Sequence, residues 1–325
     1  MPQWPQVFIV FVVFCGGCFL ESSVAHGAVD LSASDTKTVK RLPQAIIIGV
    51  KKGGTRALLE YLRLHPNISA PGPEVHFFDR YHDRGLNWYR GSKCVDEVSG
   101  RFLAVCGEQT AAKNRRPKSN AADDDGEQMT IEKTPCYFVK REVPARIHRM
   151  SSAIKLIVVV RDPSTRAISD YTQSFSKGRT KRSFDEMLFH DGKEKINERW
   201  SAVRIGMYAK HLSKWLPYFP LEQIHFVNGE ELINNPVNEM QAVERFLGLP
   251  SFISDDHFNF NATKGFPCVK RRHTDTDFRC LGATKGRTHP SLSARTLQLL
   301  NQFYARHNKL FYEMTGRDFG WPEKL

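Results

Sequence analysis

The chain has 325 residues, 41% of them hydrophobic and 25% charged, a globular composition that excludes a mostly disordered chain, a collagen and a disulfide-knotted miniprotein. Its single long apolar stretch, near the N-terminus, excludes a membrane protein with several spans. The 47 lysines and arginines against 35 aspartates and glutamates give a net charge of +12, which predicts a polyanionic partner such as nucleic acid, an anionic lipid, or a sulfated or phosphorylated substrate, unless the charge serves solubility alone.

Residues 1–28 are predicted to be a targeting segment. The apolar run VFIVFVVFCGGCFL, residues 7–20, is short for a membrane span of about 20 residues but has the length of a signal-peptide core. Ser23-Val24-Ala25 then offers a small-x-small cleavage site. Because no lysine or arginine precedes the run, a signal-anchor that leaves the rest of the chain in the lumen is the alternative. The polar residues 29–43 are predicted to be a stem.

Sequons and cysteines agree with export. Asn67 and Asn261 each begin an N-glycosylation acceptor triplet. Beyond the apolar run five cysteines remain: Cys94, Cys106, Cys136, Cys268 and Cys280. In an oxidising compartment, disulfides between the first two and between the last two would each close a short loop and leave Cys136 over. Because the cysteines lack CxxC spacing and a histidine cluster, no zinc site is expected.

Three apolar runs alternate with helical patterns. They are residues 44–49 (QAIIIG), 155–160 (KLIVVV) and 224–227. Leucines at helical spacing follow the first run, and after the second Pro163 stands near the start of a helix marked by Ile168, Tyr171 and Phe175. Strands that are apolar throughout and alternate with helices predict an α/β fold with a central, mostly parallel sheet flanked by helices.

The remaining chain adds helices and one insertion. Residues 111–128 contain RRPK and DDD but few large apolar side chains, and are predicted to be an exposed insertion. Three stripes at helical spacing are predicted to be core: Ile205, Tyr208, Leu212 and Trp215; Met240, Val243 and Leu247; and Leu297, Leu300, Phe303 and Tyr304.

Residues 49–56, GVKKGGTR, have the pattern of a phosphate-binding loop between a strand and a helix. Glycines let the backbone approach a phosphate, and the N-terminus of the following helix offers unpaired N–H groups and partial positive charge. Lys51, Lys52 and Arg56 add full charge, and Thr55 adds a hydroxyl. A plain strand-to-helix turn with solvent-facing lysines is the weaker interpretation.

A Walker nucleotide loop is the obvious alternative. It requires a lysine directly before the hydroxyl residue, where this chain has Gly54. The next apolar strand ends in Arg161 and not in a magnesium-binding aspartate. The loop therefore predicts a nucleotide with more than one anionic group and no ATP hydrolysis. Arg161 at the end of a buried strand is well placed for such a ligand, and a surface ion pair with Asp162 is its alternative.

At these residues the chain resembles a known family. KKGGTRALLEYL resembles the phosphosulfate loop of sulfotransferases that use 3′-phosphoadenosine 5′-phosphosulfate (PAPS). Arg161-Asp162-Pro163 with Ser169-Asp170-Tyr171 resembles their 3′-phosphate-binding strand and helix. The motifs EVHFFD, EKTPCYF, WSAVRIGMYAKHL, FNATKGFPC and CLGATKGRTHP, in this order, resemble the heparan sulfate glucosamine 3-O-sulfotransferases over residues 43–321, apart from the insertion.

This resemblance implies a P-loop-like, PAPS-binding sulfotransferase domain over residues 44–325. The implied reaction moves a sulfuryl group from PAPS to the 3-hydroxyl of a glucosamine in heparan sulfate, releases PAP and requires no metal. Two alternatives remain open: sulfation of another glycan position, and a non-catalytic heparin-binding relative. The implied location is the Golgi lumen, as a type II anchored or a soluble protein, with membrane contact only through the N-terminus. Export and the lack of a recognition motif argue against nucleic acid.

The resemblance also implies roles for single residues. Glu74 aligns with the family's general base, and Lys52 is expected to stabilise the leaving phosphate. An extended backbone would put His76 on the same side as Glu74, where it could orient Glu74, bind substrate or act as base itself. Asp79 is expected to hold neighbouring positive groups. Pro73 stands where relatives commonly have a lysine.

The remaining implied residues form three sets. Donor binding is assigned to Lys51, Lys52, Gly53, Gly54, Thr55 and Arg56, to Arg161 and Ser169, and to the loop Lys285, Gly286, Arg287 and Thr288, which Cys268 and Cys280 would hold. Acceptor binding is assigned to Glu74, His76, Lys133, Gln173, Lys177, Trp200 and Ser201. Further candidates for contact with a polyanion are Arg166, Arg179, Lys181, Lys270, Arg271 and Arg272.

Overall fold

The computed structural model describes residues 38–91, 94–96, 128–190, 193–270, 276–282 and 286–322. The chain divides into two units after Asp35, and every described residue belongs to the second. The predicted targeting segment, most of the stem, almost all of the insertion, Lys285 and the Cys94–Cys106 pairing lie outside the described residues and stay predictions. No helix within the described ranges is long and apolar enough to cross a membrane.

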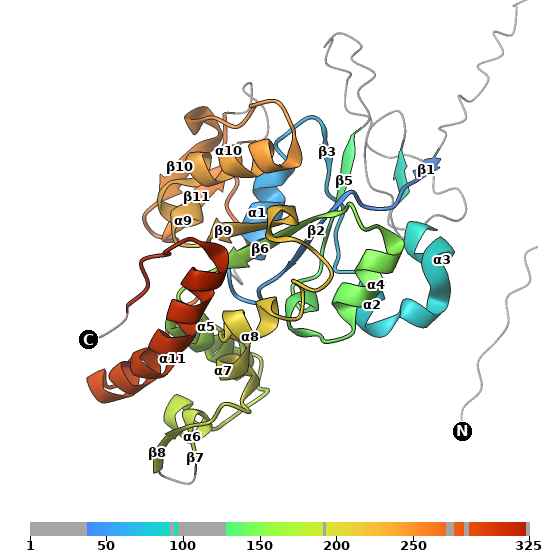
Figure 1. Cartoon of the computed structure of the whole chain (residues 1–325). Coiled ribbons are helices and arrows are strands. Elements are labelled where there is room, and N and C mark those ends of the chain that lie inside the picture. Colours follow the sequence, from blue (N-terminus) through green and yellow to red (C-terminus); the bar gives the residue numbers. More distant parts are fainter. Residues whose placement is uncertain are drawn as a thin grey trace, which may run out of the picture. The chain divides into compact units, whose positions relative to one another are not determined.

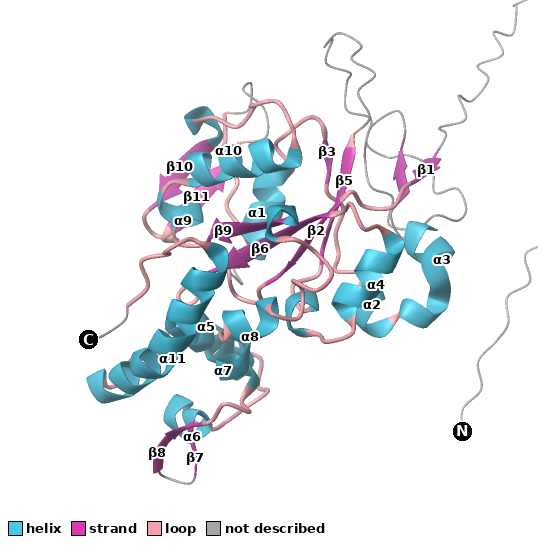
Figure 2. Cartoon of the chain, viewed as in Figure 1, coloured by secondary structure: helices cyan, strands magenta, loops and turns pink. Residues whose placement is uncertain are grey.

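A five-stranded parallel sheet forms the centre of the second unit, which confirms the predicted fold class (Figures 1 and 2). The three apolar runs form its strands β2, β6 and β9, and two further strands that the apolar pattern did not indicate extend the sheet beyond β2. All neighbouring strands are parallel. In sheet order the strands are β3 (Ile68–Ser69), β5 (Met129–Lys133), β2 (Ala45–Gly49), β6 (Lys155–Val160) and β9 (Ile224–Asn228).

Both faces of the sheet are buried, because side chains alternate along each strand between two cores. Ile46 and Val158 belong to one cluster, whereas Ile47 and Val159 belong to the other. All four are fully buried, and each such side chain stabilises the fold by about 1.5–3 kcal/mol. Helices α4 (Val143–Met150), α8 (Tyr208–Leu212) and α11 (Ala294–Thr315) contribute to the first cluster, and α1 (Thr55–Leu62) and α10 (Pro236–Leu247) to the second (Figure 1).

The other elements surround this centre. The remaining helices are α2 (Phe77–Arg80), α3 (Gly85–Gly91), α5 (Pro163–Ser176), α6 (Phe184–Leu188), α7 (Ser201–Ile205) and α9 (Glu231–Asn234), with 3-10 turns at His82–Arg84, Tyr137–Val139, Leu221–Gln223 and Asp255–His257. Three antiparallel pairs are formed by β1 (Thr38–Lys40) with β4 (Cys94–Asp96), β7 (Phe189–His190) with β8 (Lys193–Ile196), and β10 (Phe258–Asn261) with β11 (Phe266–Val269).

One predicted helix is wrong in form although its stripe is buried. The pattern from Ile205 to Trp215 indicated a continuous helix, but α7 ends at Ile205 and α8 begins at Tyr208. The reason lies in a neighbour: the Tyr304 hydroxyl donates to the carbonyl of Val203 at 2.7 Å, and a Cβ at Gly206 would lie 2.8 Å from that hydroxyl. A tertiary contact therefore takes up a carbonyl at the end of α7.

The start of helix α5 agrees with its prediction. Pro163 occupies its first turn, and the Asp162 carboxylate caps it by accepting from the backbone N–H groups of Ser164 and Thr165 at 3.3 and 2.9 Å. Asp162 is therefore a helix cap, and the alternative that paired it with Arg161 is wrong. The predicted apolar face of α5 is not buried at the end of the helix, where Phe175 is 53% exposed.

Candidate active site

A cavity of about 1370 Å³ opens where the parallel strands β2, β5, β6 and β9 end. Among the described residues its lining contains two carboxylates, those of Glu60 and Glu74, so the cavity is strongly cationic. Such a charge distribution suits a ligand with several anionic groups. The eleven basic residues that line it are Lys51, Lys52, Arg56, Arg63, Arg80, Lys133, Arg161, Arg179, Lys264, Arg279 and Arg287.

The predicted phosphate loop joins β2 to α1 and forms one wall of the cavity. Gly53 packs so tightly that a Cβ there would collide with the carbonyl oxygen of Val159 on β6. Gly54, with φ +120°, is the N-cap of α1, and no side chain caps this helix or puts an acidic group in its first turn. Its first backbone N–H groups are thus directed at the loop, next to Thr55 and Lys52. Lys52 has a left-handed backbone, φ 71°, which is a strained conformation typical of functional sites.

The loop is tied to α5 by a buried ion-pair network that sequence reasoning missed. The ammonium nitrogen of Lys51 lies 2.7 Å from Oδ1 of Asp170, whose other oxygen is 3.2 Å from the Arg166 guanidinium. Arg166 also donates to the backbone carbonyls of Lys51 and Ala202. The prediction that Arg166 contacts a polyanion is wrong, because its side chain is fully buried and pairs within the protein.

Arg161 directly follows β6 and lines the cavity. Its Nε is 3.4 Å from the Glu230 carboxylate, which also accepts from the Asp162 N–H at 3.0 Å and the Trp321 indole. That Nε is buried yet makes no hydrogen bond to any described residue. Glu230 thus holds the guanidinium by charge and leaves its donors for a ligand. Burial raises the pKa of Glu230, although the Asp162 N–H and Arg161 oppose the shift.

Two more side chains complete the surroundings of Arg161. Ser169, on α5, lines the cavity as predicted. His289, which the sequence analysis did not single out, lines it as well. Burial first, and then the positive charges of Arg161 and Lys52, lower the pKa of His289. The lowered pKa indicates that, without a bound anion, the positive charges in the cavity oppose protonation of His289.

The side chains of Glu74 and His76 lie next to each other in the cavity lining. Glu74 precedes α2, and His76 is the N-cap of this helix. Nε2 of His76 is 3.5 Å from the Glu74 carboxylate, and its Nδ1 is 3.2 Å from both oxygens of Asp79. The other Glu74 oxygen accepts from the ammonium group of Lys133. The backbone is not extended as predicted, since His76 is left-handed with φ 56° and is the N-cap of α2. The two side chains still meet, and a carboxylate held in this way can accept a proton from a hydroxyl group.

Lys133 owes its place to the alternation along β5. It lines the cavity, whereas its neighbour Glu132 points to the other side and is fully buried. Glu132 accepts from Thr134 at 2.6 Å, from Tyr137 at 3.2 Å and from Tyr89. Burial and the nearby Glu132 carboxylate raise the pKa of Tyr89, so its hydroxyl remains a donor. A buried carboxylate with three hydroxyl donors fixes this strand behind the cavity.

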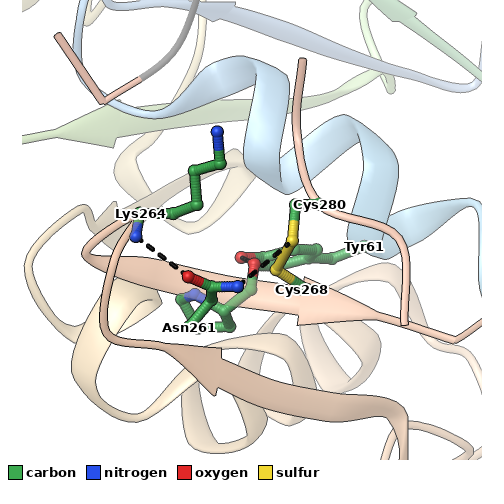
Figure 3. Close-up of a disulfide and its surroundings, with 6 residues drawn as sticks. Tyr61, Asn261, Lys264, Cys268 and Cys280 are labelled. Carbon is green, nitrogen blue, oxygen red and sulfur yellow. Dashed lines mark hydrogen bonds between the residues drawn. A yellow bond between two sulfur atoms is a disulfide. The ribbon is translucent and has the colours of Figure 1, made fainter. Parts of the chain in front are cut away.

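The second predicted basic loop reaches the cavity next to a disulfide. The predicted bond between Cys268 and Cys280 is present, and Cys280 lines the cavity together with Gly286 and Arg287. Figure 3 shows Asn261 beside this disulfide: its amide donates to Cys280 Sγ at 3.8 Å and accepts from the Lys264 N–H at 3.0 Å. The disulfide therefore joins the β10–β11 hairpin to the segment that precedes the loop.

The structure brings most, but not all, of the predicted residues together. Gln173 lines the cavity, but Thr288, Trp200 and Ser201 are not among the lining residues described. Trp200 packs against Phe184 and Tyr171, with ring centroids at 5.4 and 6.3 Å. Asp79 lies behind His76, and its side chain is almost fully buried.

The chain is similar to known sulfotransferases over most of its length. The model of the sulfotransferase domain matches residues 42–311, a range that includes every described residue lining the cavity. Heparan sulfate glucosamine 3-O-sulfotransferase 6 of Mus musculus is 51% identical over 282 residues, 87% of this chain and 74% of that protein. Heparan sulfate glucosamine 3-O-sulfotransferase 3A1 of Mus musculus is 52% identical over 310 residues, 94% of this chain and 71% of that protein.

A more distant relative and one solved structure agree with these matches. Heparan sulfate glucosamine 3-O-sulfotransferase 5 of Homo sapiens is 42% identical over 290 residues, 87% of this chain and 75% of that protein. The crystal structure of a sulfotransferase from Alicyclobacillus acidocaldarius has a TM-score of 0.56 and 21% sequence identity, and covers 86% of this chain and 97% of its own. At this identity the structural likeness supports the fold alone.

Proposed function

The chain belongs to the heparan sulfate glucosamine 3-O-sulfotransferases, and from this premise we propose that it transfers a sulfuryl group from PAPS to the 3-hydroxyl of a glucosamine in heparan sulfate. One observation carries the proposal. The phosphate loop with Lys52, the Arg161 guanidinium and the Glu74 carboxylate all line one cationic cavity. Sulfuryl transfer needs these three functions together: a grip on the donor's phosphates, positive charge at the leaving oxygen, and a base for the hydroxyl.

The donor fits the residues on the loop side of the cavity. The backbone of Gly53 and Gly54, the start of α1, Thr55 and Arg56 would hold the 5′ side, with Lys51 and Lys52 next to it. Arg161, whose buried Nε has no hydrogen-bond partner among the described residues, would take the 3′-phosphate together with Ser169. Gly286 and Arg287 would cover the donor from the disulfide-linked side, and Lys285 and Thr288 are assigned to the donor as their neighbours in sequence. When bound, PAPS supplies the activated sulfuryl group.

The acceptor side is assigned to Glu74 and its neighbours. Glu74 would remove the proton from the 3-hydroxyl, held in position by Lys133 and by His76, which Asp79 orients from behind. Lys52 would stabilise charge on the leaving phosphate. Lys133 and Gln173 suit the carboxylate, sulfate and hydroxyl groups of the polysaccharide. Trp200 and Ser201, outside the cavity lining, would contact sugar units farther along the chain.

The proposal includes the setting of the reaction. PAP would be released after transfer, with no metal in the chemistry. The protein would work in the Golgi lumen, either soluble or held by its N-terminal segment as a type II protein, and would contact the membrane only there. The Cys268–Cys280 disulfide supports an oxidising compartment, as do the sequons at Asn67 and Asn261. The polysaccharide, not nucleic acid, would be the polyanionic partner.

Transfer of labelled sulfate tests the proposal. The full chain is incubated with heparan sulfate and PAPS carrying labelled sulfate, and the product is digested to disaccharides. Label at the 3-hydroxyl of glucosamine is the expected result. Label at another position would retain the donor site and overturn the acceptor assignment. No label, with PAPS still bound, would favour a relative that binds heparin without catalysis.

A further inference from the structure

Three metal-ligating side chains meet beside the cavity: His76 and Asp79 lie close together in the sequence, and Cys136 comes from a separate segment. The Cys136 Sγ lies 3.1 Å from Oδ2 of Asp79 and 3.4 Å from Nδ1 of His76, sixty residues away in the chain. His76 Nδ1 is 3.2 Å from the same oxygen, Oδ2 of Asp79. Cys136 is a free cysteine. The spacing of cysteines and histidines predicted no metal site, because only the fold brings Cys136 next to His76 and Asp79.

The triangle of sulfur, nitrogen and oxygen has the dimensions of a tetrahedral ion site. Zinc bonds of about 2.0–2.3 Å at tetrahedral angles hold such ligand atoms roughly 3.3–3.5 Å apart. The three separations, 3.1 to 3.4 Å, need a shift of only a few tenths of an ångström to accept the ion. We propose that Cys136, His76 and Asp79 form a binding site for Zn²⁺, with the fourth position open to water or another ligand. A thiolate and an imidazole favour this ion over a hard cation such as Mg²⁺.

The site is accessible and electrically balanced. His76 and Cys136 both line the cavity, so an ion can enter from it. Asp79 is almost fully buried and already accepts from the thiol. On binding, the S–H proton leaves for solvent as the Zn–S bond forms, and the imidazole stays neutral because it binds through an unprotonated Nδ1 and carries its one proton on Nε2. The thiolate and the carboxylate then match the ion's two positive charges.

Zinc at this position would inhibit sulfuryl transfer, a consequence that rests on the proposed function. The ion would take Nδ1 of His76 and the Asp79 carboxylate, and these are the groups that orient His76 toward Glu74. The binding itself does not rest on the proposed function. The two statements can therefore fail separately.

Cobalt titration of the full chain tests the binding. Co²⁺ replaces Zn²⁺ in such sites, and a thiolate ligand gives it a charge-transfer absorption. The native chain should show this band at about one equivalent, and added Zn²⁺ should remove it. Cys136→Ser should lose the band, whereas His82→Gln, a change at a nearby histidine outside the cluster, should keep it. No band in the native chain, or an undiminished band in Cys136→Ser, would overturn the site.

Sulfate transfer in the presence of Zn²⁺ tests the inhibition. Zinc should lower the turnover of the native chain at least about 10-fold, EDTA should restore it, and Mg²⁺ should have no such effect. Cys136→Ser should keep its basal turnover and need about 10–100-fold more zinc for the same inhibition. A cobalt band in a chain without any transfer would refute the proposed function and leave the site standing. Zinc inhibition that is equal in Cys136→Ser would refute the site's role.

Discussion

The ammonium nitrogen of Lys51 lies 2.7 Å from the carboxylate of Asp170, which ties the phosphate loop to helix α5. Asp170 is buried, and its second oxygen faces the fully buried Arg166. Arg166 in turn donates to the backbone carbonyl of Lys51 at 3.1 Å. Both the side chain and the backbone of Lys51 are therefore fixed from behind. The loop that would hold the donor's 5′ side is therefore positioned by Asp170 and Arg166, neither of which lines the cavity.

Replacing Asp170 with Asn should weaken both the fold and the grip on the nucleotide. The change leaves Arg166 buried without its counter-charge, which costs about 3–5 kcal/mol of unfolding free energy. Lys51 also loses its anchor, and we expect PAP to bind about 10-fold more weakly, measured by calorimetric titration below the unfolding temperature. Asp83→Asn, at an exposed residue of the turn after α2, is the matched control and should change neither quantity. Unchanged PAP affinity in Asp170→Asn would show that the pair serves stability alone.

Glu74→Gln should abolish turnover and leave donor binding nearly intact. A general base contributes about 10²–10⁴-fold to the rate, and the amide cannot take the acceptor's proton. We expect a loss of this size in the initial rate of sulfate transfer, with PAP affinity changed less than about 2-fold. Glu60→Gln changes the other carboxylate of the cavity, which pairs with Arg56 and Arg63, and should keep most of the turnover. If Glu74→Gln remained active, His76 would become the leading candidate for the base.

Arg161→Ala should act on donor affinity more than on the acceptor. Hydrogen bonds to a charged group contribute about 1.5–3 kcal/mol each, so PAP should bind roughly 10–100-fold more weakly. The Michaelis constant for heparan sulfate should change little. Arg199→Ala, at an exposed position outside the cavity lining, is the control. An unaltered PAP affinity in Arg161→Ala would refute the assigned contact with the 3′-phosphate.

His289 should make nucleotide binding depend on pH. Burial and the charges of Arg161 and Lys52 lower its pKa in the free protein, and a bound polyanion would raise it again. Binding then takes up a proton, so affinity should rise as the pH falls below about 6.5 toward the lowered pKa. The measurement is PAP affinity from pH 7.5 to 5.5 in the native chain and in His289→Gln. Titration of PAP itself affects both proteins equally. Parallel curves of PAP affinity against pH for the native chain and His289→Gln would therefore contradict the prediction.

Acid should destabilise the fold through two buried histidines. Burial lowers the pKa of His211 and of His225 to about 4, while an unfolded chain binds these protons near 6.5. Between those pH values the unfolded state binds more protons than the folded state. The free energy of unfolding is therefore highest above pH 6.5 and decreases as the pH drops toward 4. Each histidine can contribute on the order of 3 kcal/mol to this loss.

The variant His225→Phe isolates one of the two histidines. The His225 ring stacks on Phe246 with centroids 5.0 Å apart, and its Nε2 makes no hydrogen bond to a described residue, so Phe can replace it with little rearrangement. The unfolding midpoint is followed by circular dichroism from pH 7.5 to 4.5. We expect a smaller decline for His225→Phe than for the native chain. Equal declines would show that His225 does not carry the acid sensitivity.

Local signals in the sequence determined the framework. A short run of apolar residues buries both faces of a strand, so β2, β6 and β9 could be predicted from the apolar pattern of the sequence. The phosphate loop was equally predictable from its glycines, which the structure uses for a close approach to a backbone oxygen at Gly53 and a positive φ at Gly54. The strand β5 was not, since it carries Glu132 and Lys133 in place of an apolar run. Their burial is possible only because partners from other segments satisfy both charges.

Only the tertiary structure decided what each charged side chain does. A sequence shows that Arg166 is basic but not that Asp170 and two carbonyls surround it in the interior. It likewise places Cys136 sixty residues from His76, while the fold brings their sulfur and nitrogen atoms to 3.4 Å. The physical reason is one of range. The spacing of apolar residues determines which face of a single helix or strand is buried. Ion pairs and ligand sets depend instead on distances between side chains of different strands and helices, which meet at the edge of the sheet where several strands end.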